Sequence, residues 1–202
     1  MEELTQKRMR VRIPVWTISI VVLSIVSFIS SELSSLFIYD RVAILGGELW
    51  RLFTSHLVHF SYFHFLYNII AFGVLGWVIE QQDYPYFGSL LLLMAFIIGV
   101  ALLVMKPDML FYGGLSGLAH GAFFYLALHG LYHSLYWRRI SLLAIGIISM
   151  KVTIEWYQEI FVVNADAEQE YITMHLSHII GVAVAVMFFL VLAYNKHREN
   201  NL

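Results

Sequence analysis

The chain has 202 residues, of which 60% are apolar and only 13% are charged, and its mean hydropathy is +0.75. Soluble domains carry roughly 25% charged residues, so this chain cannot cover a water-facing surface, and we expect a polytopic membrane protein. The net charge of −2 argues against a nucleic-acid partner. The absence of cysteine excludes disulfides, thiolate metal sites and thiol nucleophiles.

Six apolar segments are long enough to cross a bilayer, whose core of about 30 Å needs roughly 20 residues of helix. The predicted spans are 14–31, 61–80, 84–105, 115–136, 140–161 and 172–194. We therefore expect an all-α fold, a bundle of six transmembrane helices at 14–194 with short tails at 1–13 and 195–202.

The distribution of Lys and Arg predicts the orientation, because these residues are more frequent in cytoplasmic segments. If the N-terminus is cytoplasmic, Arg41, Arg51 and Lys106 lie outside. Eight others lie inside: Lys7, Arg8, Arg10, Arg12, Arg138, Arg139, Lys196 and Arg198. Both termini are therefore expected in the cytoplasm, and the acidic stretch 164–170 in an external loop.

The second span carries polar side chains that are expensive inside a membrane. His64 and Asn68 are four residues apart and share one helix face. An imidazole and a carboxamide on one face could hold an oxyanion. The alternative is that they make a hydrogen bond between helices.

The fourth span opens with a serine among glycines, since Gly113–Gly117 reads Gly-Gly-Leu-Ser-Gly. Glycines leave the Ser116 hydroxyl uncovered, and a helix N-terminus offers unpaired N–H groups to a developing oxyanion. The alternative is a helix cap with small packing residues. A helix over all of 115–136 would put Ser116 about 33 Å from Arg138, unless it ends at Gly130 and the chain returns to the interface.

The sixth span places His178, Gly181 and Ala185 on one stripe. Small residues allow another helix to approach closely, and the glycine-rich start of the fourth span suits such a contact. His178 could then take the proton of Ser116, which is a weak nucleophile without a base. The alternative is a structural histidine bonded to a carbonyl.

The fifth span holds Lys151, Glu155 and Glu159, each four residues apart on one face. Lys151 and Glu155 could simply neutralise each other. The same ladder could line a wet cavity or contact a substrate.

Taken in order, these elements resemble the rhomboid family of intramembrane serine proteases. The resemblance runs from about Trp50 to Ala185 and includes a Trp-Arg pair before the histidine-rich second span, Gly-Leu-Ser-Gly in the fourth and His-x-x-Gly in the sixth. It implies a rhomboid-like bundle in which Ser116 is the nucleophile and His178 the base, with no acid completing a triad. His64, Asn68 and the Ser116 amide would form the oxyanion hole.

The resemblance also implies supporting roles around these residues. His59 would be a structural histidine beneath the external loop, Arg51 would belong to the hairpin of the first loop, and Glu80 would fix the inner end of the second span. Gly114, Gly117 and Gly181 would support the site. Neither a metal nor another cofactor is implied, and the site would open to the periplasmic side of a bacterial inner membrane.

One departure resembles the rhombosortase branch of the family. Typical rhomboids have a tyrosine four residues after the serine, stacked on the catalytic histidine, whereas this chain has His120. Together with Lys151 and the run Glu155–Gln158, His120 implies substrates with one hydrophobic span, a C-terminal Gly-Gly motif and a basic end. Glu155 or Glu159 could contact the amides of the extended substrate.

Two other functions remain open from the sequence. A zinc-dependent membrane hydrolase could use His175 and His178 with His120 or His64 as ligands, although no His-Glu-x-x-His motif is present. An inactive rhomboid relative could bind membrane helices without cutting them, but such relatives usually lose the serine or the histidine. A transporter has little support, since there is one intramembrane charge ladder.

Overall fold

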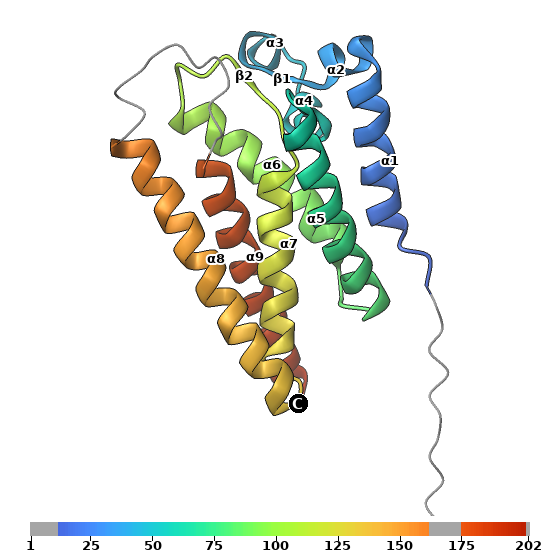
Figure 1. The fold of residues 1–202 in the computed structure, drawn as a ribbon, viewed down its shortest axis with the longest axis vertical. Helices are drawn as coiled ribbons and strands as arrows, with labels where there is room; N and C mark the ends of the chain where they lie inside the picture. The colour runs from blue at the N-terminus through green and yellow to red at the C-terminus, as the bar shows by residue number, and fades with distance from the viewer. Residues whose placement is uncertain (1–11, 162–174, 201–202) are drawn as a thin grey trace, which may run out of the picture.

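The structure is a computed structural model that describes residues 12–161 and 175–200. Its long helices stand side by side, and short elements gather at one end of the bundle (Figure 1). The elements are α1 (Val15–Ile29), α2 (Ser31–Phe37), β1 (Tyr39–Asp40), α3 (Arg41–Leu45), α4 (Arg51–Thr54), a 3-10 turn (Ser55–Leu57), α5 (Tyr62–Gln81), α6 (Phe87–Met105), β2 (Phe111–Tyr112), α7 (Ser116–Gly130), α8 (Leu135–Phe161) and α9 (His175–Glu199).

The described helices fit an all-α membrane bundle, as predicted. By length and apolarity α5, α6, α8 and α9 could each cross a membrane, and α1 could do so together with α2, from which it bends by 116°. α1 and α7 coincide with the two other predicted spans, but each has only 15 residues.

The predicted span 115–136 is wrong at its C-terminal end. α7 stops at Gly130, the chain turns through the next four residues, and α8 begins at Leu135 instead of residue 140. The apolar residues after Gly130 extended the hydropathy signal, but they form the reversal between two helices. α7 is therefore a short helix of 15 residues.

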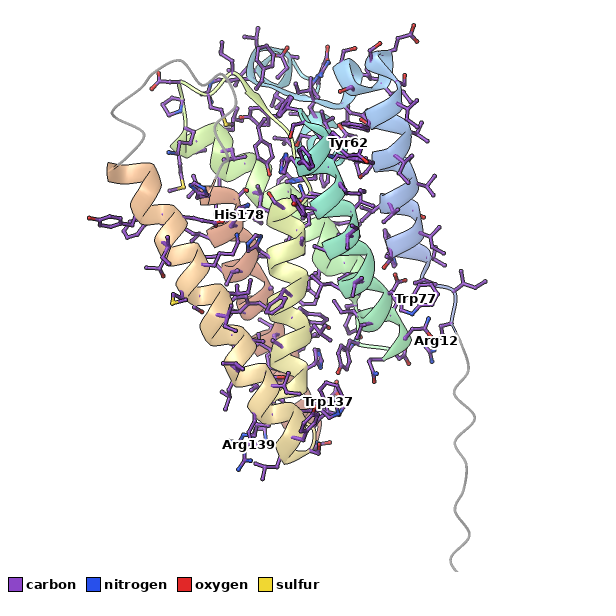
Figure 2. The ribbon with its side chains drawn as sticks, in the orientation of Figure 1. Arg12, Tyr62, Trp77, Trp137, Arg139 and His178 are labelled. Carbon is purple, nitrogen blue, oxygen red and sulfur yellow. The ribbon has the colours of Figure 1, made fainter. Side chains whose placement is uncertain are left out.

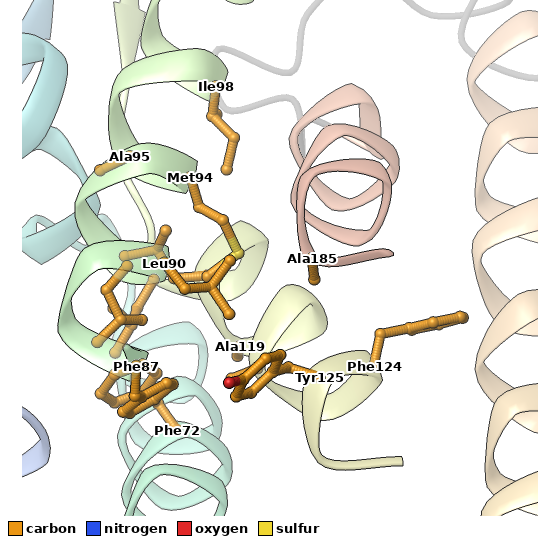
Figure 3. Packing of buried hydrophobic residues seen from close by; sticks show 14 of the residues in the cluster. Phe72, Phe87, Leu90, Met94, Ala95, Ile98, Ala119, Phe124, Tyr125 and Ala185 are labelled. Carbon is orange, nitrogen blue, oxygen red and sulfur yellow. The ribbon is translucent and has the colours of Figure 1, made fainter. Parts of the chain in front are cut away.

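The apolar core lies around α6 and α7. Leu90, Met94 and Ile98 of α6 are completely buried, and Figure 3 shows them directed toward α7 and α9. Tyr125 of α7 is also completely buried. α7 packs against α5, α6, α8 and α9, so residues at its N-terminus can meet side chains from several helices.

The first loop, between α1 and α5, folds into short elements, and its strand β1 pairs with β2, which comes just before α7. β1 pairs antiparallel with β2, with Tyr39 opposite Tyr112. Arg51 holds the hairpin together, because its guanidinium donates to the carbonyls of Ser35 and Ile38 at 2.8 Å and forms an ion pair with Glu48 at 2.7 Å. Arg51 thus lies in the hairpin of the first loop, as expected. β2 ends at Tyr112, four residues before the start of α7 at Ser116.

At the opposite end of the bundle, Glu80 of α5 caps α1. Its carboxylate accepts hydrogen bonds from the backbone N–H groups of Trp16 and Thr17, at 3.1 and 2.8 Å, and from the Thr17 hydroxyl at 2.6 Å. The first N–H groups of a helix have no partner within it, and Glu80 supplies one. The expected anchoring of this end of α5 is therefore present.

Candidate active site

Ser116 is the first residue of α7 and lies beside His64 of α5. Between them is Gly114, whose φ of +147° favours glycine. A Cβ atom on Gly114 would lie 2.9 Å from His64 Cε1 and 3.8 Å from Ser116 Oγ. Because Gly114 has no side chain, the His64 imidazole and the Ser116 hydroxyl can both lie close to its Cα atom.

The segment before α7 is held by residues of the first loop and by Tyr112 of β2. The N–H of Gly114 donates to the Ser55 carbonyl at 3.2 Å, and the Tyr112 hydroxyl donates to the Gly114 carbonyl at 3.2 Å. The N–H of Leu115 donates to His59 Nε2 at 3.4 Å. Burial lowers the pKa of His59 to about 4, so the imidazole is neutral and can accept. His59 thus supports the start of α7.

α7 and α9 are in direct backbone contact. A Cβ atom on Gly121 would lie 2.7 Å from the Gly181 carbonyl oxygen, and one on Gly117 would lie 3.0 Å from the Ser177 carbonyl oxygen. A Cβ on Gly181 would overlap the Gly117 carbonyl. The close approach predicted from these glycines is present, and it brings His178 next to α7.

His178 packs against His120 rather than a tyrosine. The two rings are stacked, with centroids 4.0 Å apart and planes 13° apart. His120 Nδ1 donates to the Ser116 carbonyl at 2.7 Å, which fixes its ring on the helix. Figure 2 shows His178 on α9 at the end of the bundle where α7 begins.

Three of the buried nitrogen atoms that have no hydrogen-bond partner within the described part of the chain belong to predicted site residues. They are His64 Nε2, Asn68 Nδ2 and His178 Nε2. They come from α5 and α9, two of the helices that pack on α7. A buried polar group left unpaired costs about 1–3 kcal/mol, so each of these three groups in the predicted site needs an explanation.

α8 contributes a carboxylate to the same place. Glu155 Oε2 lies 2.9 Å from His178 Nδ1, and Glu155 also forms an ion pair with Lys151. Lys151 Nζ in turn donates to His120 Nε2 at 3.1 Å. The resemblance implied that no acid completes a triad with Ser116 and His178, yet the structure places the Glu155 carboxylate against His178. The face of α8 that carries Lys151 and Glu155 therefore contacts α7 and α9. The side chain of Glu159 lies outside the described residues.

The same groups are the candidate metal ligands. His120, Glu155 and His178 offer three ligand atoms within 4.8 Å of one another. The Lys151 ammonium already bonds to two of these side chains, so a metal ion would have to displace it. Of the other predicted ligands, His175 lies near His178, with ring centroids 5.9 Å apart.

The Rhomboid domain family matches residues 46–195. The chain belongs to the rhomboid family. The matched rhomboid region includes Ser116, His178 and all the other predicted site residues.

Curated rhomboid relatives match part of the chain. The rhomboid protease GlpG of Salmonella newport (strain SL254) is 32% identical over 90 residues, which is 43% of this chain and 31% of the relative. The rhomboid proteases GlpG of Salmonella heidelberg (strain SL476) and Salmonella schwarzengrund (strain CVM19633) match equally. The chain thus spans about a third of the length of the curated relatives it matches.

Proposed function

We propose that this rhomboid chain is an intramembrane serine endopeptidase with Ser116 as nucleophile and His178 as general base. The observation that supports this most directly is the set of buried unpaired nitrogens on α5 and α9, two helices that pack against α7, which begins at Ser116. His178 Nε2, a buried imidazole nitrogen without a hydrogen-bond partner in the described chain, is suited to take the serine proton. Unpaired donors on His64 and Asn68 are suited to bind a negative charge that exists only during the reaction.

In the proposed reaction, the proton of Ser116 moves from Oγ to His178 Nε2 as Oγ attacks the peptide carbonyl. His64, Asn68 and the Ser116 amide hold the resulting oxyanion. When the C–N bond breaks, His178 returns the proton to the leaving amine. Water, or another acceptor, then releases the acyl group from Ser116. No metal or other cofactor takes part in these steps.

The proposed substrates are membrane proteins with a single C-terminal hydrophobic helix, cut near its outer end. His120 beside His178 and the Lys151–Glu155 pair support the rhombosortase branch, and hence exported proteins with a Gly-Gly motif. Glycine disfavours helix, so such a site would unwind easily before attack. We place the chain in a bacterial inner membrane with cytoplasmic termini and the site open to the periplasm. The charge distribution supports this, although Lys7, Arg8 and Arg10 lie outside the described residues.

The test is co-expression with a reporter that ends in Gly-Gly, a hydrophobic span and a basic tail, followed by size on a gel. We expect cleavage by wild type and none by Ser116→Ala or His178→Ala. A second reporter with Leu-Leu in place of Gly-Gly tests the branch and should be cut much less. Cleavage by Ser116→Ala at the wild-type level would refute the serine mechanism.

A zinc-dependent hydrolase is the second candidate, favoured by the cluster of His120, Glu155 and His178. It predicts that a chelator stops cleavage and that Ser116→Ala is tolerated. The serine protease predicts the reverse for both. Treating the wild-type membranes with chelator in the same experiment therefore separates the two functions.

A further inference from the structure

The contact between Glu155 and His178 has no part in the Ser-His mechanism proposed above. Their side chains are 18% and 5% exposed, and they meet at hydrogen-bond distance. Ionised groups inside a membrane bundle are costly unless they are paired. The contact between a carboxylate on α8 and the predicted base on α9 therefore points to a role in function.

The neighbours of His120 allow only one placement of its hydrogen. The Ser116 carbonyl can only accept, so His120 Nδ1 carries a hydrogen and donates it. The other ring nitrogen of a neutral imidazole accepts, and Lys151, which can only donate, is its partner. Of the pair formed by His120 and Lys151, it is therefore Lys151 that carries the positive charge.

The same reasoning gives the proton arrangement of His178. Glu155 is paired with the Lys151 ammonium through one carboxylate oxygen, and an ionised carboxylate can only accept. The hydrogen between Glu155 Oε2 and His178 therefore belongs to Nδ1. In the uncharged form of the ring, which a general base requires, the lone pair then lies on Nε2, the buried atom without a partner in the described chain. This is the tautomer that a base for Ser116 requires.

We infer that Glu155 completes a Ser116–His178–Glu155 triad as a positioning residue, an inference that rests on the proposed serine protease function. As the Ser116 proton moves to His178 Nε2, the ring becomes positively charged. Glu155 stabilises that charge and fixes the ring and its tautomer without taking the proton. Lys151 holds the second carboxylate oxygen, and His120 stacks on the ring. The site thereby differs from the Ser-His dyad implied by the family resemblance.

The test compares purified wild type with Glu155→Gln and Glu155→Asp on a single-span peptide carrying the Gly-Gly reporter site. Glutamine keeps the size of the side chain but lacks the charge. We expect kcat to fall by about 10³-fold or more, as removal of a triad carboxylate does elsewhere, with KM within about threefold. Aspartate keeps the charge at a longer distance, so its kcat should fall only about tenfold.

Glu48→Gln is the matched control, because Glu48 is also ion-paired, with Arg51, but lies in the outer hairpin. It should leave kcat unchanged. Thermal unfolding of each variant in detergent separates a chemical from a structural role. A carboxylate that only attached α8 would change the melting temperature, and kcat would follow the folded fraction. The rate of Ser116 labelling by a fluorophosphonate gives a second readout that does not depend on substrate binding.

The outcomes separate the two claims. If wild type neither cleaves nor labels, the proposed function is wrong. If wild type is active and folded Glu155→Gln keeps kcat within about threefold of it, the triad is wrong. If Glu155→Gln does not fold, Glu155→Asp decides, and a wild-type kcat for that variant overturns the triad.

Discussion

α9 and α8 both bring a group to the start of α7, but by different means. α9 approaches α7 closely enough for backbone contact, with Gly181 against Gly117 and Gly121, and His178 stacks on His120 beside this contact. α8 reaches the site through the side chains of Glu155 and Lys151, while most of its other side chains face outward. The position of His178 relative to Ser116 therefore depends on close backbone packing. The position of the Glu155 carboxylate depends on hydrogen bonds between side chains.

Among variants that test this comparison between α9 and α8, the largest effect on stability is expected from Gly181→Ala, which breaks the backbone contact. The new Cβ would overlap the Gly117 carbonyl, and a backbone atom cannot move aside cheaply. We expect the free energy of unfolding to fall by about 3 kcal/mol. Cleavage should fall by about 100-fold or more, because His178 would move away from Ser116. Unfolding in mixed micelles and the reporter assay measure these changes.

The control for this variant is Gly146→Ala on α8, where a Cβ atom would meet nothing within 4 Å. It should leave cleavage unchanged and raise stability by about 0.4–1 kcal/mol, since alanine restricts the unfolded chain. Equal losses in Gly146→Ala and Gly181→Ala would mean that helix glycines matter for a reason other than the α7–α9 contact.

A smaller effect is expected from Lys151→Met. Removing the ammonium leaves Glu155 in place but without its cation, and His120 Nε2 without its donor. We expect kcat to fall by about tenfold, less than for Glu155→Gln, because the carboxylate still reaches His178. Steady-state kinetics measure this, and a larger loss than in Glu155→Gln would assign the main role to the lysine.

The smallest effect is expected from Gly130→Ala, at the end of α7 that faces α8. The nearest atom to its Cβ would be the Ser141 hydroxyl, which can rotate away. The gain in helix propensity of about 1 kcal/mol offsets much of this crowding, so the stability loss should stay below 1 kcal/mol or so. A loss as large as that of Gly181→Ala would show that α8 is packed as rigidly as α9.

Composition and hydropathy predicted the membrane bundle, because a lipid-facing helix must be apolar along its whole length. They failed at Gly130, where apolar residues continue through a chain reversal. They did not predict the first hairpin, whose short elements depend on distant partners such as the Arg51 contacts with Ser35 and Ile38.

The candidate site was only partly predictable for a similar reason. The glycine stripe predicted the contact between α7 and α9, since small residues on a membrane helix suit close packing. Helical spacing put Lys151 and Glu155 on one face, but spacing does not say which neighbour a face meets. The bond between Glu155 and His178 joins residues 23 positions apart, and it depends on the rotation of α8, which hydropathy does not encode.

The cap on α1 has a consequence for how the protein is made. Thr17 is synthesised 63 residues before Glu80, so the ribosome has produced the whole first loop and α5 before the N–H groups at the start of α1 find their partner. Until then only water or lipid headgroups can satisfy them. The first helix therefore reaches its final depth in the bilayer only when the second arrives. Loss of Glu80 should accordingly appear as slow or incomplete assembly during biosynthesis, ahead of any defect in the assembled enzyme.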